Sequence, residues 1–380
     1  MAKYIMSCAN SAETQYNLNW GYLNKPYVVY QEDTQQIDFN SLSAQTPTPY
    51  FTQYLTMTSQ NDFSFGIYTM NGYGRNVSYE YSVDGGNWTT IQYGSSTPSF
   101  SGGSVVRLRG NIEYISQSDS QQGRFDIAGS NVHVYGNILS LIYGDDFTTN
   151  IEVPDYCFAY TFWNCVPLTS IENLVLPAMS TKCYMQMFTY CINLTDGRCI
   201  LPMKQLTTDC YNQMFQGCNN LVQAPSLPAT TLAENCYYQM FQNCSSLTTA
   251  PALPATTLAN KCYYQMFQGC NNLVQAPALP ATTLASNCYS NMFRECTSLT
   301  TAPELPATTL PEECYYYMFQ GCTNLNYIKC LATNISGTNC TYNWVDSVAP
   351  TGTFVKASSM TSWTTGTNGI PNNWTVEDNA

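Results

Sequence analysis

Charged side chains are scarce in this sequence, and basic ones most of all. Only 10% of its 380 residues are charged, and 25 acidic residues against 13 lysines and arginines give a net charge of −12. A chain this acidic is a poor partner for nucleic acid or anionic lipid, because both bind through basic patches. No apolar run reaches the length of a membrane-spanning helix, so we expect no membrane insertion.

Histidine is nearly absent, which removes most catalytic and metal-binding arrangements. A lone His133, with no C-x-x-C motif and no phosphate-binding glycine loop, supports neither a Ser/His/Asp triad nor a metal centre. Asp145 and Asp146 are adjacent, so their carboxylates point apart, which indicates a loop or a helix cap. We therefore predict a protein that is not an enzyme and holds no metal or cofactor. The facing carboxylates of a glycoside hydrolase are not excluded by one sequence.

What the chain does have is a repeated block of the form C-Y-x-x-M-F-x-x-C. The block returns every 26 residues, with a single step of 27, and is capped near Cys340, where Trp344 and Val345 replace Met and Phe. A fixed period of this length is typical of a solenoid, in which stacked neighbours bury an apolar stripe that no unit can bury alone. The blocks begin at Cys157, Cys183, Cys210, Cys236, Cys262, Cys288 and Cys314.

Each unit is predicted to combine a short helix with a short strand. Leu232, Cys236, Met240 and Cys244 lie four residues apart, a spacing that favours one stripe on a helix. The following segment, 245–254, carries two prolines and is expected to be extended. The fold class that follows is a mixed α/β solenoid.

The residues L-P-A-T-T-L-A-x-x-C-Y-Y-x-M-F-x-G-C-x-x-L resemble the BspA-like class of leucine-rich repeat, common in surface proteins of gut and oral bacteria. The resemblance covers roughly residues 137–345 and includes the Leu-Pro step at Leu227-Pro228 and Leu253-Pro254. Here Cys replaces the usual Ile at the first core position, and the repeats are longer than usual. The resemblance implies a right-handed solenoid used for binding, with no catalytic residues.

Four regions are expected: an N-terminal arm at 1–47, a β-sandwich at 48–135, the leucine-rich repeat solenoid at 136–340 and a C-terminal cap at 341–380. Short alternating runs separated by turn residues predict the sandwich, and 79–89 predicts a hairpin. This region resembles an immunoglobulin-like module. Its predicted strands are 50–58, 63–70, 77–83, 88–93, 105–109 and 125–127.

The arm is rich in Gln, Asn and Thr, and only Tyr27–Tyr30 could pair as a strand. The apolar stretch before Cys8 is too short for a lipoprotein signal peptide. Without an export signal the chain is either trimmed or belongs to a protein outside the secretion pathway, such as a virion component. In that second case residues 1–47 would anchor it to capsid or tail proteins.

The cysteines are predicted to be buried free thiols. Sixteen of the 18 lie between Cys157 and Cys330, mostly as the repeated pair. On a helix, partners eight residues apart would be roughly 12 Å apart, beyond the ~7 Å limit for a disulfide. Stacked ladders of small apolar side chains are the simpler interpretation.

Two rows of side chains are predicted to face outward and to bind. The Tyr that follows the first Cys of each block is expected to be half-buried with its hydroxyl outward, and the next position, which varies, to point to solvent. Such variation is also expected where nothing constrains a position. The candidate binding residues are Tyr238, Tyr264, Tyr316 and Tyr317 in the first row, and Gln223, Thr249, Gln275, Thr301 and Tyr327 on the extended segment.

Three functions are compatible with these features. One is a surface-displayed adhesion protein that recognises a host glycan or protein, on a bacterial cell or as a virion fibre. Another is a purely structural virion component, with which assembly into a homo-oligomer is compatible, and the third is an accessory module of an enzyme. The ligand is not determined by the sequence.

Overall fold

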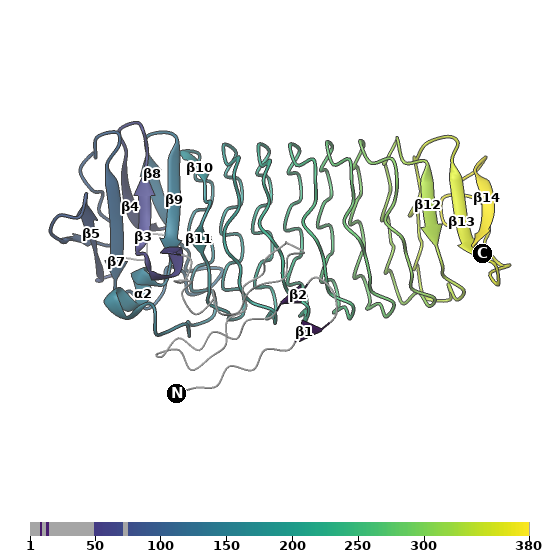
Figure 1. Ribbon diagram of the computed structural model, residues 1–380, viewed down its shortest axis with the longest axis horizontal. Coiled ribbons are helices and arrows are strands. Elements are labelled where there is room, and N and C mark those ends of the chain that lie inside the picture. The colour runs from purple at the N-terminus through teal and green to yellow at the C-terminus, as the bar shows by residue number, and fades with distance from the viewer. Residues whose placement is uncertain (1–7, 10–12, 15–48, 71–74, 380) are drawn as a thin grey trace.

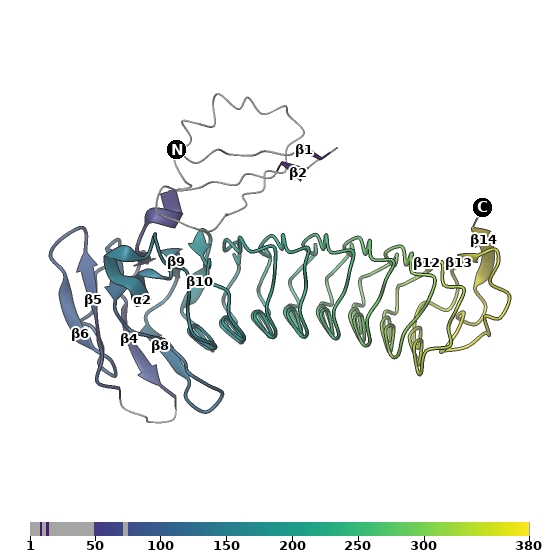
Figure 2. The ribbon, with the colours of Figure 1, turned by 90° about the horizontal axis from the view of Figure 1, so that it is seen from below.

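A computed structural model describes residues 8–9, 13–14, 49–70 and 75–379. Figures 1 and 2 show coils following one another in a single row, with a β-domain at one end and a small parallel sheet at the other. The predicted arm at 1–47, with its candidate strand at 27–30, lies outside the described residues except for β1 and β2, which pair antiparallel. The elements are β1 Cys8–Ala9, β2 Glu13–Thr14, η1 Pro49–Thr52, β3 Leu55–Thr58, β4 Ser64–Thr69, β5 Ser78–Val83, β6 Thr89–Gln92, β7 Val105–Gly110, β8 Gly123–Ala128, β9 Val132–Asn137, α2 Ser140–Tyr143, η2 Gly144–Asp146, β10 Leu168–Ser170, β11 Leu174–Val175, β12 Tyr327–Cys330, β13 Thr353–Ala357 and β14 Thr375–Asn379.

The β-domain contains the strands that alternation predicted, β3 to β8, and the β5–β6 hairpin is confirmed as an antiparallel pair. One sheet has the order β10-β9-β3-β7-β5-β6, and β4 pairs with β8 in a second. Strand β9 was not predicted, although Val132 and Val134 alternate as buried residues within it. It is the strand with which the first coil of the repeat array pairs.

Strand β9 joins the β-domain to the coils. Both β10 and β11 belong to the first coil, and both pair in parallel with β9. Backbone bonds reinforce the junction: the Phe125 N–H donates to the Thr161 carbonyl at 2.7 Å and the Ile115 N–H to the Cys157 carbonyl at 2.8 Å. The first coil therefore continues a sheet whose edge would otherwise be open.

The prediction of a short helix in each repeat is wrong. The block from Cys236 to Cys244 is a series of turns, and the fold is mostly β with one α-helix of four residues, α2, in the part of the chain that is described. Within the block, φ is positive at every fourth residue: 54° at Asn235, 52° at Gln239 and 61° at Asn243. We call this block the turn segment.

In the turn segment, hydrogen bonds to the next coil take the place of the hydrogen bonds that a helix would form within itself. The Tyr238 N–H donates three residues back, to Asn235 at 3.1 Å, while the Gln239 N–H donates to the Tyr264 carbonyl of the following coil at 2.8 Å. This alternation continues along the segment, so only half of the N–H groups bond locally. A helix would also rotate a four-residue stripe by about 40° at each step, whereas a four-residue turn keeps it in register.

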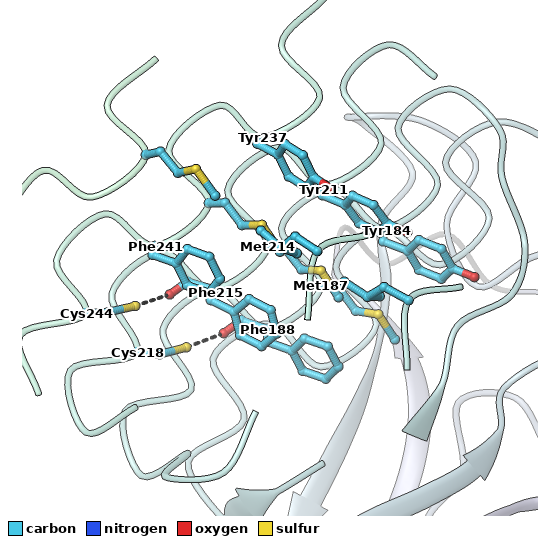
Figure 3. Close-up of a cluster of buried hydrophobic side chains, with 14 of the residues drawn as sticks. Tyr184, Met187, Phe188, Tyr211, Met214, Phe215, Cys218, Tyr237, Phe241 and Cys244 are labelled. Atoms are coloured by element: carbon cyan, nitrogen blue, oxygen red, sulfur yellow. Dashed lines mark hydrogen bonds between the residues drawn. The ribbon is translucent and has the colours of Figure 1, made fainter. Parts of the chain in front are cut away.

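The turn segments bury continuous columns of side chains. The first Cys, the following Tyr, the Met-Phe pair and the second Cys are all 0–2% exposed in the blocks from Cys183 to Cys322. Figure 3 shows Tyr184, Tyr211 and Tyr237 in one column and Phe188, Phe215 and Phe241 in another. Neighbouring rings in the tyrosine column are 5.8 Å apart with planes within 14° between Tyr184 and Tyr289.

The expectation that these tyrosines are half-buried with outward hydroxyls is wrong. Each has at most 2% of its surface exposed, because the turn geometry points this position inward beside the cysteine. We call this set the inner tyrosine column: Tyr184, Tyr211, Tyr237, Tyr263, Tyr289 and Tyr315.

The prediction of buried free thiols is confirmed for the repeat cysteines, although the helical premise behind it was wrong. From Cys191 to Cys322, the second thiol of each block donates to a phenylalanine carbonyl in the preceding coil, as Cys218 does to Phe188 at 3.1 Å and Cys244 to Phe215 at 3.2 Å. Burial raises the pKa of Cys218 to about 12. These thiols are therefore neutral small core groups.

Aromatic side chains close both ends of the columns. Phe125 of β8 stacks on Phe162 of the first coil at 5.1 Å, so the β-domain supplies the first ring of the phenylalanine column. At the other end Trp344 lies 6.0 Å from Tyr315 and 6.2 Å from Phe319. Beyond it, β12, β13 and β14 form a parallel sheet.

Candidate binding surface

The outward positions of the turn segments form the first candidate surface. Tyr238 and Tyr264 are half-buried, and their rings stack at 4.9 Å with planes 4° apart. Tyr316 stacks on Tyr342 at 5.4 Å and meets the perpendicular ring of Tyr317 at 4.4 Å. We call Tyr238, Tyr264, Tyr316 and Tyr342 the outer tyrosine column.

The structure brings these tyrosines together in two pairs rather than in one row. Ser290 occupies the corresponding position between Tyr264 and Tyr316 and is fully buried. Tyr342, which is 39% exposed, was missed because the sequence analysis ended the array at Cys340. The recurrence of Tyr two residues after Cys340 was the signal that could have identified it.

Glutamine ladders lie beside the outer tyrosine column. The amide of Gln186 donates to Gln213 at 2.7 Å, Gln213 donates to Gln239 at 2.7 Å, and Gln239 donates to Gln265. A parallel ladder joins Gln216, Gln242 and Gln268. Each amide holds its neighbour, so the surface beside the rings is rigid, polar and uncharged. Sequence reasoning did not single out these glutamines, although they recur at two fixed positions of the block.

The second candidate row lies on the extended segment of each coil. Gln223, Thr249, Gln275 and Thr301 are exposed, and Tyr327 is half-buried in β12. Parallel bridges join Thr249 to Gln275 and Thr301 to Tyr327. The side chains therefore repeat along adjacent coils and offer hydroxyls and amides, with Tyr327 as the sole aromatic ring of the row.

Burial and neighbouring charges raise the pKa of the outer tyrosines. For Tyr238 burial is the main cause, followed by the neighbouring Tyr264. For Tyr264 burial comes first, Glu313 raises the pKa further and Arg294 lowers it. These phenols remain neutral at physiological pH and act as donors and acceptors of hydrogen bonds.

Catalytic geometry is not supported at the acidic pair or the histidine. Asp145, in η2, accepts hydrogen bonds from the Tyr54 hydroxyl at 2.7 Å and from Arg109 Nη1, which together keep the pKa of its carboxyl below the usual range. His133 Nε2 lies 3.0 Å from the Glu172 carbonyl oxygen. Among the described residues, no three potential metal ligands cluster.

The geometry defines a repeat protein with a row of exposed polar side chains and a column of half-buried, outward-facing tyrosines. Residues 147–274 and 261–345 match the BspA type leucine rich repeat region in six copies. The matched span exceeds half of the chain, and the chain belongs to this family. No curated protein matches the sequence.

A solved structure is also similar to this chain. It is a leucine-rich repeat protein from Bacteroides ovatus, 12% identical, with a TM-score of 0.18, and the match covers 65% of this chain and 88% of that one. Across the residues that the structure describes, no helix is both long and apolar enough to span a bilayer.

Proposed function

We propose that this protein is a non-enzymatic binding protein that attaches to a cell-surface glycan or protein through the outer tyrosine column. The observation that carries the proposal is the pairing of half-buried, outward-facing aromatic rings with amide ladders on one face of the stacked coils. Tyr offers large contact area and a hydroxyl at low conformational entropy cost, which suits sugars and proteins alike.

Membership of the BspA-type family supports this function, because its members are often surface adhesion proteins. We further propose that the protein is displayed on a bacterial cell surface or as a virion fibre, and that residues 1–47 anchor it there. We also propose that residues 48–135 form an immunoglobulin-like domain and that the solenoid is right-handed. Many copies on one particle would raise the avidity of weak individual contacts.

The test replaces Tyr238, Tyr264 and Tyr316 together with Ser. Attachment to the host cell or isolated ligand should fall by at least about tenfold, because aromatic anchors commonly contribute 2 kcal/mol or more to binding. Loss of the stacking contacts should cost only ~1 kcal/mol of folding stability, so the melting temperature should fall by a few degrees at most.

The matched control replaces Gln223 and Gln275 with Ala, which alters the other candidate row. This control should bind like the unmodified protein. If the triple variant attaches normally and the glutamine variant does not, the extended segment is the binding surface and the proposal is wrong.

A further inference from the structure

The β-domain carries a polar hollow of its own. Its volume is about 330 Å³, at the lower end of the ~300–1,000 Å³ that is typical of small-molecule sites. Strands β5 and β6, the end of β7 and the short helix η2 all contribute to its lining. Figures 1 and 2 place these strands at the end of the molecule opposite β12, β13 and β14, so the hollow is separate from the outer tyrosine column.

Three lining side chains form a cross-strand row on the outer face of the sheet. Glu80 of β5 is paired with Thr90 of β6 on one side and with Arg109 of β7 on the other. The alternate residues Tyr79 and Tyr81 are buried in the core, so the row points away from it. Thr90 is exposed, and the hollow opens on the face of the sheet that the core does not use.

Arg109 connects the row to η2. Its Nε donates to Glu80 Oε2 at 2.7 Å, and its Nη1 donates to both carboxylate oxygens of Asp145 at 2.8 and 2.9 Å. The guanidinium also lies 4.2 Å from the Trp88 ring centre, and the Tyr54 hydroxyl donates to Asp145 at 2.7 Å. These contacts pre-organise the lining, so a ligand would bind at little cost in side-chain entropy.

Several lining groups keep unused hydrogen-bonding capacity. Glu80 uses only Oε2, and its Oε1 accepts no hydrogen bond from the described residues. The exposed side chains of Ser78, Thr90 and Asn111 also line the hollow and form no hydrogen bond within that part of the chain. One carboxylate oxygen, two hydroxyls and one amide therefore surround the same small space.

This set of groups suits a neutral, hydroxyl-rich ligand. Two carboxylates against one guanidinium leave a net negative charge that repels an anion, and a cation would compete with Arg109, which both carboxylates already bind. Sugar hydroxyls donate and accept at once, so they can pair with Glu80 Oε1 and with the free hydroxyls and amide. An apolar ligand is disfavoured, because the lining is more polar than that of most small-molecule sites.

We propose that this hollow binds one neutral sugar unit at the end of a glycan, through hydrogen bonds from Glu80, Thr90 and Asn111, with Arg109 and Asp145 as positioning residues. The inference does not rest on the proposed function, because the outer tyrosine column contributes no side chain to the hollow. It gives the β-domain a binding role of its own.

The experiment fills the hollow without removing its ion pairs. Full-length Thr90→Trp protein places an indole in the hollow from an edge strand, where aromatic residues are well tolerated. The matched control is Thr89→Trp, because adjacent residues of a strand point to opposite faces. Ligand-observed saturation-transfer NMR is recorded with glucose, galactose, mannose, fucose and N-acetylglucosamine, and with glucuronic acid and glucosamine as charged counterparts.

The unmodified protein and Thr89→Trp should bind at least one neutral sugar, and more tightly than either charged counterpart. Thr90→Trp should bind that sugar at least about tenfold more weakly. Asn111→Ala, which removes an exposed lining side chain, should weaken binding several-fold at an unchanged melting temperature. An oligosaccharide that ends in the preferred sugar should bind at least as tightly as the free sugar.

The contrary outcomes are distinct. Equal binding by Thr90→Trp and Thr89→Trp would overturn the site. Binding of no neutral sugar, or tighter binding of glucuronic acid or glucosamine, would overturn the ligand class. Binding of the free sugar without the oligosaccharide would overturn the glycan as its source. The tyrosine triple variant has an unchanged β-domain and should bind the sugar normally, so failure of the proposed function would leave these results standing.

Discussion

Single buried hydroxyl groups distinguish otherwise equivalent tyrosines of the inner column. The Tyr184 hydroxyl accepts a hydrogen bond from the Ala178 N–H at 3.0 Å. The hydroxyls of Tyr211 and Tyr263 are buried without a partner among the described protein atoms. An unsatisfied buried hydroxyl costs about 1–3 kcal/mol relative to hydration, so these two positions oppose folding locally.

Replacing Tyr263 with Phe should therefore stabilise the protein by about 1 kcal/mol, because the ring stays in the column and the unpaired hydroxyl is removed. Urea unfolding followed by circular dichroism measures the change. The matched control is Tyr184→Phe, which leaves the Ala178 N–H without its acceptor and should destabilise the protein by a similar amount. Equal effects of the two substitutions would contradict this account.

The turn segment is the element that organises each coil, and it depends on positive φ at every fourth residue. Asn or Gly tolerates this left-handed conformation best, and several positions comply, including Asn235, Asn287 and Gly217. Others do not: Lys261 has φ of 53° and Glu313 has φ of 51°. Residues other than Asn and Gly adopt positive φ at these positions because hydrogen bonds to the neighbouring coils fix the backbone conformation.

Lys261→Asn should raise the free energy of unfolding by about 1 kcal/mol, because Asn enters the left-handed region more readily than Lys. The neighbouring coils already carry Asn235 and Asn287 at this position. A thermal scan should show the increase as a higher melting temperature.

Lys261→Val is the opposing control, since a β-branched residue is disfavoured at positive φ and should lower stability. If the two variants melted at the same temperature, the backbone conformation at residue 261 would not limit stability.

At the scale of the whole molecule, the columns of buried thiols link stability to pH. Burial raises the pKa of Cys236, Cys270 and Cys288 to about 12. A thiol in the unfolded chain has a pKa of about 8.5, so the folded state holds protons that the unfolded state releases. The stability from these neutral thiols is complete below about pH 8.5 and declines as the pH rises towards 12.

We expect the repeat array to become markedly less stable in mild alkali. Between pH 7.5 and 9.5, each such thiol should lower the free energy of unfolding by about 1 kcal/mol, and several act together. Urea midpoints measured with reductant present should fall steeply over this interval. Between pH 5.5 and 7.5 the thiols should contribute almost nothing. A urea midpoint unchanged at pH 9.5 would show that the thiols are not buried in solution.

The repeat period of the sequence was sufficient to predict stacked units and a common core, and the resemblance of the repeated motif indicated their family. Equivalent positions 26 residues apart can share an environment only if the units stack, and Cys, Met and Phe at those positions can only be inside. Strands β3 to β8 of the β-domain were also predictable, because alternation and turn residues are local signals.

Only the tertiary structure decided how each unit is built and which side chains it exposes. A four-residue spacing records that Leu232, Cys236 and Met240 share a face, but not where a backbone N–H finds its acceptor. The Gln239 N–H bonds to the next coil, 2.8 Å from the Tyr264 carbonyl, and that non-local partner selects a turn where the local spacing favoured a helix. The same turn buries Tyr237, leaves Tyr238 outside, and makes Ser290 a break between two pairs of stacked rings.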